Sequence, residues 1–222
     1  MPETAYPRAT TPRAAHPQAV VPPGLLLILS GPSGSGKGTI VKSLLAADAQ
    51  MVLSVSVTTR APRPGEVEGV HYFFRTREEF ERLIAAGALL EYADYNGEYY
   101  GTPEAAVDEL LAQGKHVLLE IEVHGAEQVM DKRADTVPIF ITAPSVAALA
   151  ARLRARGTET AASLAARLAV ARYEYTRAYR YSYVVLNDEV DKAVARILAI
   201  IDAESMRTAR MKDILLEVEK QC

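Results

Sequence analysis

A short apolar segment that runs directly into a glycine-rich loop is the feature that most constrains this fold. Leu25 to Leu29 is a run of five aliphatic residues, and the sequence SGPSGSGKGT follows it. Glycines in such a loop allow backbone N–H groups to turn toward a phosphate, and a helix that starts near Lys37 directs its positive end to the same place. The pattern G-x-x-x-x-G-K therefore predicts a strand, a phosphate-binding loop and a helix, which together hold a nucleoside triphosphate.

The loop departs from the common pattern at one position. Where Ser or Thr normally contacts magnesium, the chain has Gly38, and Thr39 is the next hydroxyl along. We expect Thr39, or a water in its place, to contact the metal ion. The residues predicted to bind the triphosphate nucleotide are Gly31, Pro32, Ser33, Gly34, Ser35, Gly36, Lys37, Gly38 and Thr39.

Short apolar runs alternate with helix-length segments along the rest of the chain. Five more runs follow the first, among them VLSVSV near Met51, VHYFF near Val70 and YVVLN near Tyr183. This alternation indicates βαβ units and predicts an α/β fold with a parallel sheet flanked by helices. An apolar stripe at helical spacing predicts that the last long helix runs from about Glu189 to Met211.

Two segments fit this core poorly. Residues 54–102 are rich in Tyr, Arg, Glu and Gly, which indicates a small inserted subdomain. Residues 146–182 read as a helical hairpin with seven arginines against two acids, and arginine offers a fork of donors that matches phosphate oxygens. Residues 1–23 carry proline at every fifth position, which predicts a disordered tail; an organelle transit peptide is the alternative. The predicted core comprises residues 24–53, 103–145 and 183–222.

Composition narrows the classes of partner. The formal net charge is −3, so no overall basic field points to nucleic acid or to an anionic membrane, and we expect neither as a partner. The single cysteine, Cys222, excludes an intrachain disulfide and favours a reducing compartment, so we expect a cytoplasmic location. The four histidines lack the spacing of a metal site. The sequence leaves the oligomeric state open.

Two longer motifs follow the glycine-rich loop. They are SVSVTTRAPRPGEVEGVHYFF, from Ser54, and LLEYADYNGEYYGTP, from Leu89. With these motifs the sequence closely resembles the guanylate kinase family from about Leu25 to Met211. The resemblance implies a P-loop NTPase core with an inserted GMP-binding subdomain and a mobile helical lid. It also implies the reaction ATP + GMP → ADP + GDP with magnesium, with dGMP as a further acceptor.

Two arginines and two tyrosines form a predicted site for the phosphate of GMP. Arg60 and Arg63 lie on a loop whose backbone angles are partly fixed by proline, so their guanidinium groups are ordered in advance. Together with the hydroxyls of Tyr72 and Tyr100 they can hold a dianionic phosphate by charge-assisted hydrogen bonds. The resemblance assigns the same role to these four residues.

Glu91 is predicted to read the base. It lies in an apolar run where an unpaired carboxylate would be costly, and guanine offers two adjacent donors, N1–H and the exocyclic amine. Adenine presents an acceptor at N1 and would leave the carboxylate facing a lone pair. By resemblance, Ser56 and Thr102 add hydroxyl contacts to the base. Glu122 can reach the guanine amino group, although the family usually has an aspartate at this position.

The remaining expected roles concern the phosphoryl group itself. The GMP phosphate is already an oxyanion, so no general base is needed and catalysis reduces to alignment and charge neutralisation. Glu120 is expected to hold the magnesium shell, through water. By resemblance, Lys37, Arg156 and Arg167 neutralise the phosphoryl group in flight, Arg152 supports them, and Asn187 contacts adenine.

Two further departures and two alternative functions remain open at this stage. His71 stands where the family usually has aspartate and His124 where it has glutamine, and we interpret both as tolerated substitutions. The first alternative is a guanylate-kinase-like binding module without catalysis. The second is a kinase of another small phosphorylated acceptor, such as a different nucleoside monophosphate or a phosphorylated ribose. The presence of Lys37, Glu91 and the lid arginines favours the active GMP kinase.

Overall fold

The first predicted strand lies at the centre of a five-stranded sheet. The structure is a computed structural model that describes residues 23–155 and 160–222. The strand order is β2-β7-β1-β8-β9, and every pairing between neighbours is parallel, which confirms the α/β class with a parallel sheet. The strands are β1 (Leu26–Ser30), β2 (Met51–Leu53), β7 (His116–Glu120), β8 (Val137–Thr142) and β9 (Tyr183–Leu186).

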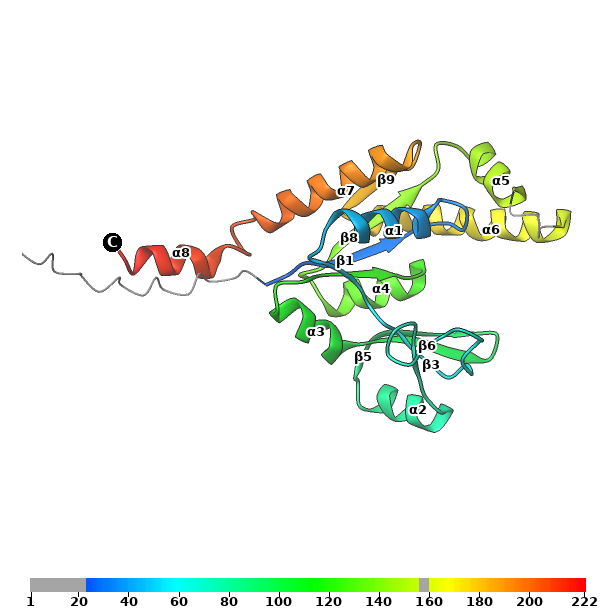
Figure 1. Cartoon of the computed structure of the whole chain (residues 1–222). Coiled ribbons are helices and arrows are strands. Elements are labelled where there is room, and N and C mark those ends of the chain that lie inside the picture. The colour runs from blue at the N-terminus through cyan, green and yellow to red at the C-terminus, as the bar shows by residue number, and fades with distance from the viewer. Residues whose placement is uncertain (1–22, 156–159) are drawn as a thin grey trace, which may run out of the picture.

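Helices cover both faces of this sheet (Figure 1). Alternate residues of a strand point to opposite faces of the sheet, and in the leucine-rich first run the residues on both faces are buried. Leu27 and Leu29 belong to one apolar cluster with residues of α1 (Lys37–Ala47) and α7 (Val190–Ser205). Leu26 and Ile28 belong to a second cluster with residues of α3 (Glu104–Ala112) and α4 (Val123–Lys132).

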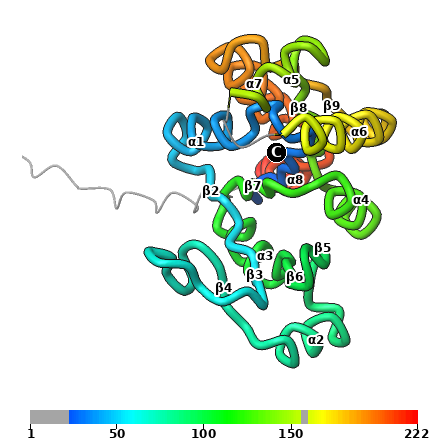
Figure 2. The backbone as a smooth tube through the Cα atoms, turned by 90° about the vertical axis from the view of Figure 1, so that its right-hand side faces the viewer, coloured from blue at the N-terminus to red at the C-terminus, as the bar shows by residue number. Residues whose placement is uncertain are grey.

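A second, smaller sheet lies beside the core (Figure 2). Its order is β4-β3-β6-β5, and the helix α2 (Arg77–Ala85) packs against it through Phe80, which is fully buried with Val57 and Leu89. The run VLSVSV passes from one sheet to the other, because the Ser54 N–H donates to the Leu118 carbonyl oxygen of the core sheet and Val57 pairs in the small sheet. Phe73 and Phe74 of the run VHYFF pair in the small sheet, inside the segment 54–102 that the sequence predicts as an insert. The strands are β3 (Val57–Thr58), β4 (Phe73–Phe74), β5 (Leu89–Tyr95) and β6 (Glu98–Pro103).

Two helices, α5 (Val146–Arg154) and α6 (Ala161–Arg177), form the hairpin at the carboxyl end of the core strands (Figure 1). A short 3-10 turn, Ala178–Arg180, follows α6. Arg177 and Arg180 bind acids of α4, with Arg177 Nε 2.6 Å from Glu127 Oε1 and Arg180 Nη2 2.5 Å from Asp131 Oδ1. These two of the seven arginines therefore anchor the hairpin to the core.

The last long helix is shorter than the sequence predicts. It ends at Ser205, and a separate helix, α8 (Lys212–Glu219), follows. At this end of the helix, Glu204 is buried and accepts a hydrogen bond from the Tyr183 hydroxyl at 2.6 Å. Arg207 and Arg210, three and six residues later, pair with the same carboxylate. Among the described residues, no helix has the length and apolar character needed to cross a bilayer.

Candidate functional site

In the glycine-rich loop that follows β1, two glycines lie too close to neighbouring residues to carry a side chain. Gly31 has φ +139°, and a Cβ atom there would lie 2.2 Å from the carbonyl oxygen of Ile141. Gly36 has φ +92°, and a Cβ atom there would lie 2.3 Å from Asn187 Nδ2. Both positions therefore require glycine for conformation and for space.

Lys37 begins α1, and its side chain folds back along the loop. Its Nζ donates to the carbonyl oxygen of Gly31 and lies 3.4 Å from that of Pro32. The N-cap residue of α1 is Gly36, and no side chain caps this end of the helix. The first backbone N–H groups of α1 and the lysine ammonium therefore surround one anion-binding position.

Residues from the far end of the chain support the loop from behind. Asn187 is 2% exposed, and its Nδ2 donates to the Ser35 carbonyl oxygen at 2.7 Å. Arg152 of α5 donates to the Ser35 and Asn187 carbonyl oxygens at 3.3 and 2.8 Å. Arg167 of α6 reaches across the opening, with Nη1 3.0 Å from Ser33 Oγ. Arg156 lies outside the described residues.

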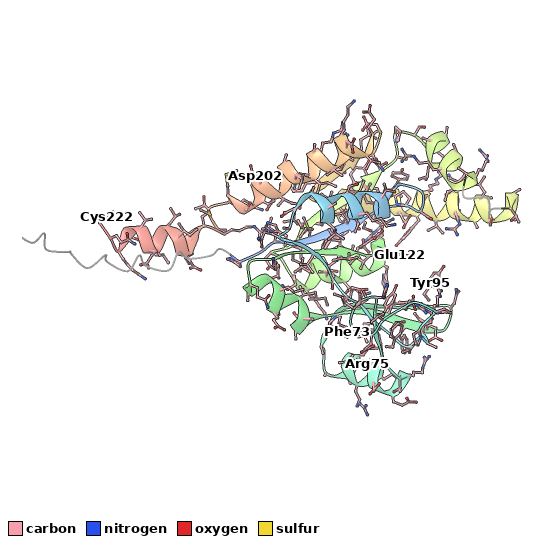
Figure 3. All side chains as sticks on the ribbon, in the orientation of Figure 1. Phe73, Arg75, Tyr95, Glu122, Asp202 and Cys222 are labelled. Atoms are coloured by element: carbon pink, nitrogen blue, oxygen red, sulfur yellow. The ribbon has the colours of Figure 1, made fainter. Side chains whose placement is uncertain are left out.

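A second binding region is a cavity of about 460 Å³ between the small sheet and the core. Figure 3 shows Glu122 at this boundary, at the start of α4. Seven of the eight residues predicted to bind GMP line the cavity, and the eighth, Thr102, lies directly behind Glu91. The seven are Ser56, Arg60, Arg63, Tyr72, Glu91, Tyr100 and Glu122.

One group of residues in the cavity lining is basic and hydroxyl-rich. The guanidinium carbon of Arg60 lies 5.4 Å from the centre of the Tyr72 ring, and the Tyr72 and Tyr100 rings meet edge to face with centres 6.0 Å apart. Arg60 also pairs with Glu66, with Nη2 2.9 Å from Oε1. This hydrogen bond raises the pKa of Arg60 and lowers that of Glu66. The charged arginine can thus serve a phosphate over the whole neutral range.

The cavity lining also includes a buried carboxylate. Glu91 is 6% exposed, and Thr102 Oγ1 donates to its Oε1 at 2.7 Å. Gly125 of α4 makes room for the other oxygen, because a Cβ atom there would lie 2.7 Å from Glu91 Oε2. Burial raises the pKa of Glu91, against opposing effects of the Thr102 hydrogen bond and the nearby His124. Oε1 of Glu91 is therefore held by Thr102, and the carboxylate can still accept hydrogen bonds from a ligand.

Two exposed side chains beside the loop carry oxygen atoms that could hold a metal ion. Glu120, at the end of β7, and Thr39, in the first turn of α1, are both exposed, and a Cβ atom on Gly38 would lie 3.7 Å from Glu120 Oε1. A carboxylate and a hydroxyl are the hard donors that magnesium prefers. Within residues 23–155 and 160–222, no cluster of three or more His, Cys, Asp or Glu could hold a metal ion. This donor set fits a magnesium ion that keeps waters and phosphate oxygens as its other ligands.

The sequence analysis missed two residues of the site. Glu66 lines the cavity and binds Arg60, and the turn sequence RPGE was the available signal for its position. Gly125 had no signal, because its role depends on the approach of Glu91 from a strand 34 residues earlier.

Comparison with known proteins gives consistent matches. The sequence model of the guanylate kinase family matches residues 24–204. A guanylate kinase of Enterococcus faecalis is 51% identical over 189 residues, which cover 85% of this chain and 93% of the relative. One from Symbiobacterium thermophilum is 48% identical over 196 residues, which cover 88% and 93%. The crystal structure of guanylate kinase from Anaplasma phagocytophilum matches with a TM-score of 0.66 and 37% identity, covering 85% of this chain and 89% of that one.

Proposed function

We propose, because this chain belongs to the guanylate kinase family, that its loop and its cavity hold the two substrates of one phosphoryl transfer. The protein is an ATP-dependent kinase that converts GMP to GDP. The observation that carries the residue assignment is the shared cavity, whose lining includes both arginines and the buried carboxylate of Glu91. A nucleoside monophosphate carries the matching groups, a phosphate for the arginines and a base with donors for the carboxylate.

We assign the GMP phosphate to the basic and hydroxyl-bearing residues of the cavity. Arg60 and Arg63 supply charged donors, and the hydroxyls of Tyr72 and Tyr100 complete the set. The assignment is supported by the contact of Arg60 with Tyr72, which brings a charged donor and a hydroxyl together in the cavity lining.

We assign guanine to the buried Glu91, whose carboxylate accepts hydrogen bonds from N1–H and from the exocyclic amine. Thr102 holds one oxygen of this carboxylate at 2.7 Å, which fixes the plane in which the base is read. Ser56 and Glu122 line the same cavity and are assigned as further contacts to the base. Because the ribose 2′ position carries none of these donors, dGMP is expected to be an acceptor as well.

Transfer requires alignment and charge neutralisation, with no proton to remove. We assign the triphosphate of ATP to the loop from Gly31 to Thr39, and adenine to Asn187, whose Nδ2 donates to the Ser35 carbonyl oxygen of that loop. Lys37 and Arg167 would neutralise the phosphoryl group in flight, since both already contact the loop. Arg152 supports the loop, and Arg156 is kept in its role on the family resemblance alone. We assign GMP binding to residues 54–102 and the lid to 146–182.

A magnesium ion is proposed as the cofactor. When bound to ATP it neutralises phosphate charge and orients the phosphates. Thr39 and Glu120 would hold it, the second through water, because both side chains are exposed and Glu120 Oε1 lies close to Gly38, the residue before Thr39. We further propose a cytoplasmic location, where both nucleotides are supplied.

A panel of acceptors tests the assignment of the cavity. Release of ADP is measured by a coupled assay with GMP, dGMP, AMP, UMP and dTMP at equal concentration. GMP and dGMP are expected to be phosphorylated and the other three to give at most a small fraction of that rate. Comparable rates with AMP would refute base reading by Glu91.

A further inference from the structure

Glu66 is an acid that the fold places among the arginines of the phosphate site. It ends the turn Arg63-Pro64-Gly65-Glu66, in which the Glu66 N–H donates to the Arg63 carbonyl oxygen at 3.0 Å. Proline at the second position and a glycine with φ +88° at the third are what a type II turn requires. The sequence therefore dictates the position of this carboxylate.

The two oxygens of Glu66 bind two different parts of the site. Oε1 accepts from Arg60 Nη2 at 2.9 Å, and Oε2 accepts from the Arg63 backbone N–H at 2.7 Å. The other terminal nitrogen of Arg60 donates to the Ala61 carbonyl oxygen at 2.7 Å. Both ends of the guanidinium are thus fixed, and the side chain of Arg60 is 15% exposed.

We infer that Glu66 is a positioning residue for the acceptor phosphate, which holds Arg60 and the turn 63–66 in place before GMP arrives. A long arginine side chain loses rotamer freedom when it binds a ligand, and prior ordering removes that cost from the binding step. The inference rests on the proposed function, in which Arg60 binds the phosphate of GMP. The low pKa of Glu66, caused mainly by its hydrogen bond to Arg60, keeps the carboxylate charged for this role.

A different role is conceivable on charge alone, in which Glu66 occupies Arg60 and competes with the phosphate. The second hydrogen bond favours positioning, because Oε2 holds a backbone N–H of the turn. A carboxylate that served only as a substitute for phosphate would have no need of this bond. The two roles predict opposite effects when the carboxylate is removed, since positioning lowers GMP affinity on its loss and competition raises it.

The test uses Glu66→Gln and Glu66→Ala in the full chain, with Glu68→Gln as the matched control. Glu68 also pairs one oxygen with an arginine, Arg75, at 2.7 Å and the other with a backbone N–H, of Phe74, at 2.8 Å. It does not line the cavity. KM and kcat for GMP are measured by the coupled assay, and the dissociation constants of GMP and guanosine by calorimetry.

Positioning predicts that Glu66→Ala raises KM for GMP by about 10- to 100-fold, the range set by one charge-assisted hydrogen bond, with kcat changed far less. Glu66→Gln is expected to have a smaller effect, because the amide oxygen can still accept one of the two bonds. Guanosine affinity and the control variant should stay at the wild-type values. A fall in KM for GMP, or an equal loss of guanosine affinity, would overturn the inference.

A double-mutant cycle with Arg60→Met separates this inference from the proposed function. Because Glu66 acts through Arg60, its substitution should change KM little in the Arg60→Met background. Equal effects of Glu66→Ala in both backgrounds would contradict positioning through Arg60. If Arg60→Met itself leaves KM for GMP unchanged, the assignment of the phosphate is at fault.

Discussion

Replacing Glu91 with glutamine changes one heavy atom of the buried acid in the cavity and tests the proposed recognition of guanine. Thr102 donates to Oε1 of Glu91 at 2.7 Å, so the amide oxygen of a glutamine would take that place. The amide nitrogen would then occupy the position of Oε2, beside Gly125. A donor would face the donors of guanine, where the wild-type protein offers an acceptor.

The magnitude follows from the hydrogen bonds that are lost. A bond to a charged group contributes about 1.5–3 kcal/mol, and a buried donor left without an acceptor costs about 1–3 kcal/mol more. Together these losses give roughly 2.5–6 kcal/mol, or about a 10²- to 10⁴-fold fall in kcat/KM for GMP. The amide offers one donor and one acceptor to adenine, so discrimination between GMP and AMP should fall by a similar factor.

The same substitution should leave the fold intact. Burial raises the pKa of Glu91, which means that the ionised carboxylate costs stability at neutral pH, and glutamine removes that cost. Loss of the charge-assisted bond from Thr102 offsets part of the gain. We expect a thermal midpoint equal to or above that of the wild type.

Initial rates with GMP and AMP, together with thermal melts, measure both effects. Glu81→Gln is the matched control, because Glu81 lies on α2 of the same insert, pairs with Arg77 and is 54% exposed. An unchanged kcat/KM for GMP in Glu91→Gln would show that Glu91 does not bind guanine. A loss that accompanied a large fall in the thermal midpoint would show that the residue acts through stability.

Two further predictions concern the loop and the titration of the base-reading acid. Lys37→Met should lower kcat by at least about 100-fold without lowering the thermal midpoint. The control is Lys42→Met, which changes an exposed residue on the same helix and should keep wild-type activity. Equal activity of the two variants would remove Lys37 from the mechanism. KM for GMP should rise as the pH falls through the raised pKa of Glu91, starting above the ordinary glutamate value of about 4.3, because a protonated carboxyl cannot accept from both guanine donors. The Glu91→Gln variant should lack this rise, and an identical pH profile would assign the titration to another group.

The sequence was most informative where a local pattern fixes a backbone conformation. The run from Leu25 into the glycine-rich loop predicts strand, loop and helix, because Gly31 and Gly36 adopt conformations that other residues resist. The turn before Glu66 is local in the same way. Patterns of this kind carry their own geometry and need no knowledge of distant contacts.

Features that depend on distant partners could not be predicted in this way. The excess of arginine in residues 146–182 suggested phosphate contacts, yet Arg177 and Arg180 pair with acids of α4 that lie about 50 residues earlier. The apolar stripe toward Met211 likewise does not show that the helix ends at Ser205, beside Glu204, which is buried and accepts a hydrogen bond from Tyr183, 21 residues earlier. In both cases the local pattern does not encode the contact with a residue distant in the sequence.

The central claim is that one cavity holds guanine on Glu91 and the acceptor phosphate on Arg60 and Arg63, opposite the loop that binds ATP. A crystal structure with GMP and a non-hydrolysable ATP analogue tests it most directly. We expect N1 and the exocyclic amine of guanine within hydrogen-bond distance of the Glu91 carboxylate, and the GMP phosphate on both arginines. Guanine bound elsewhere, or a phosphate that contacts neither arginine, would contradict it.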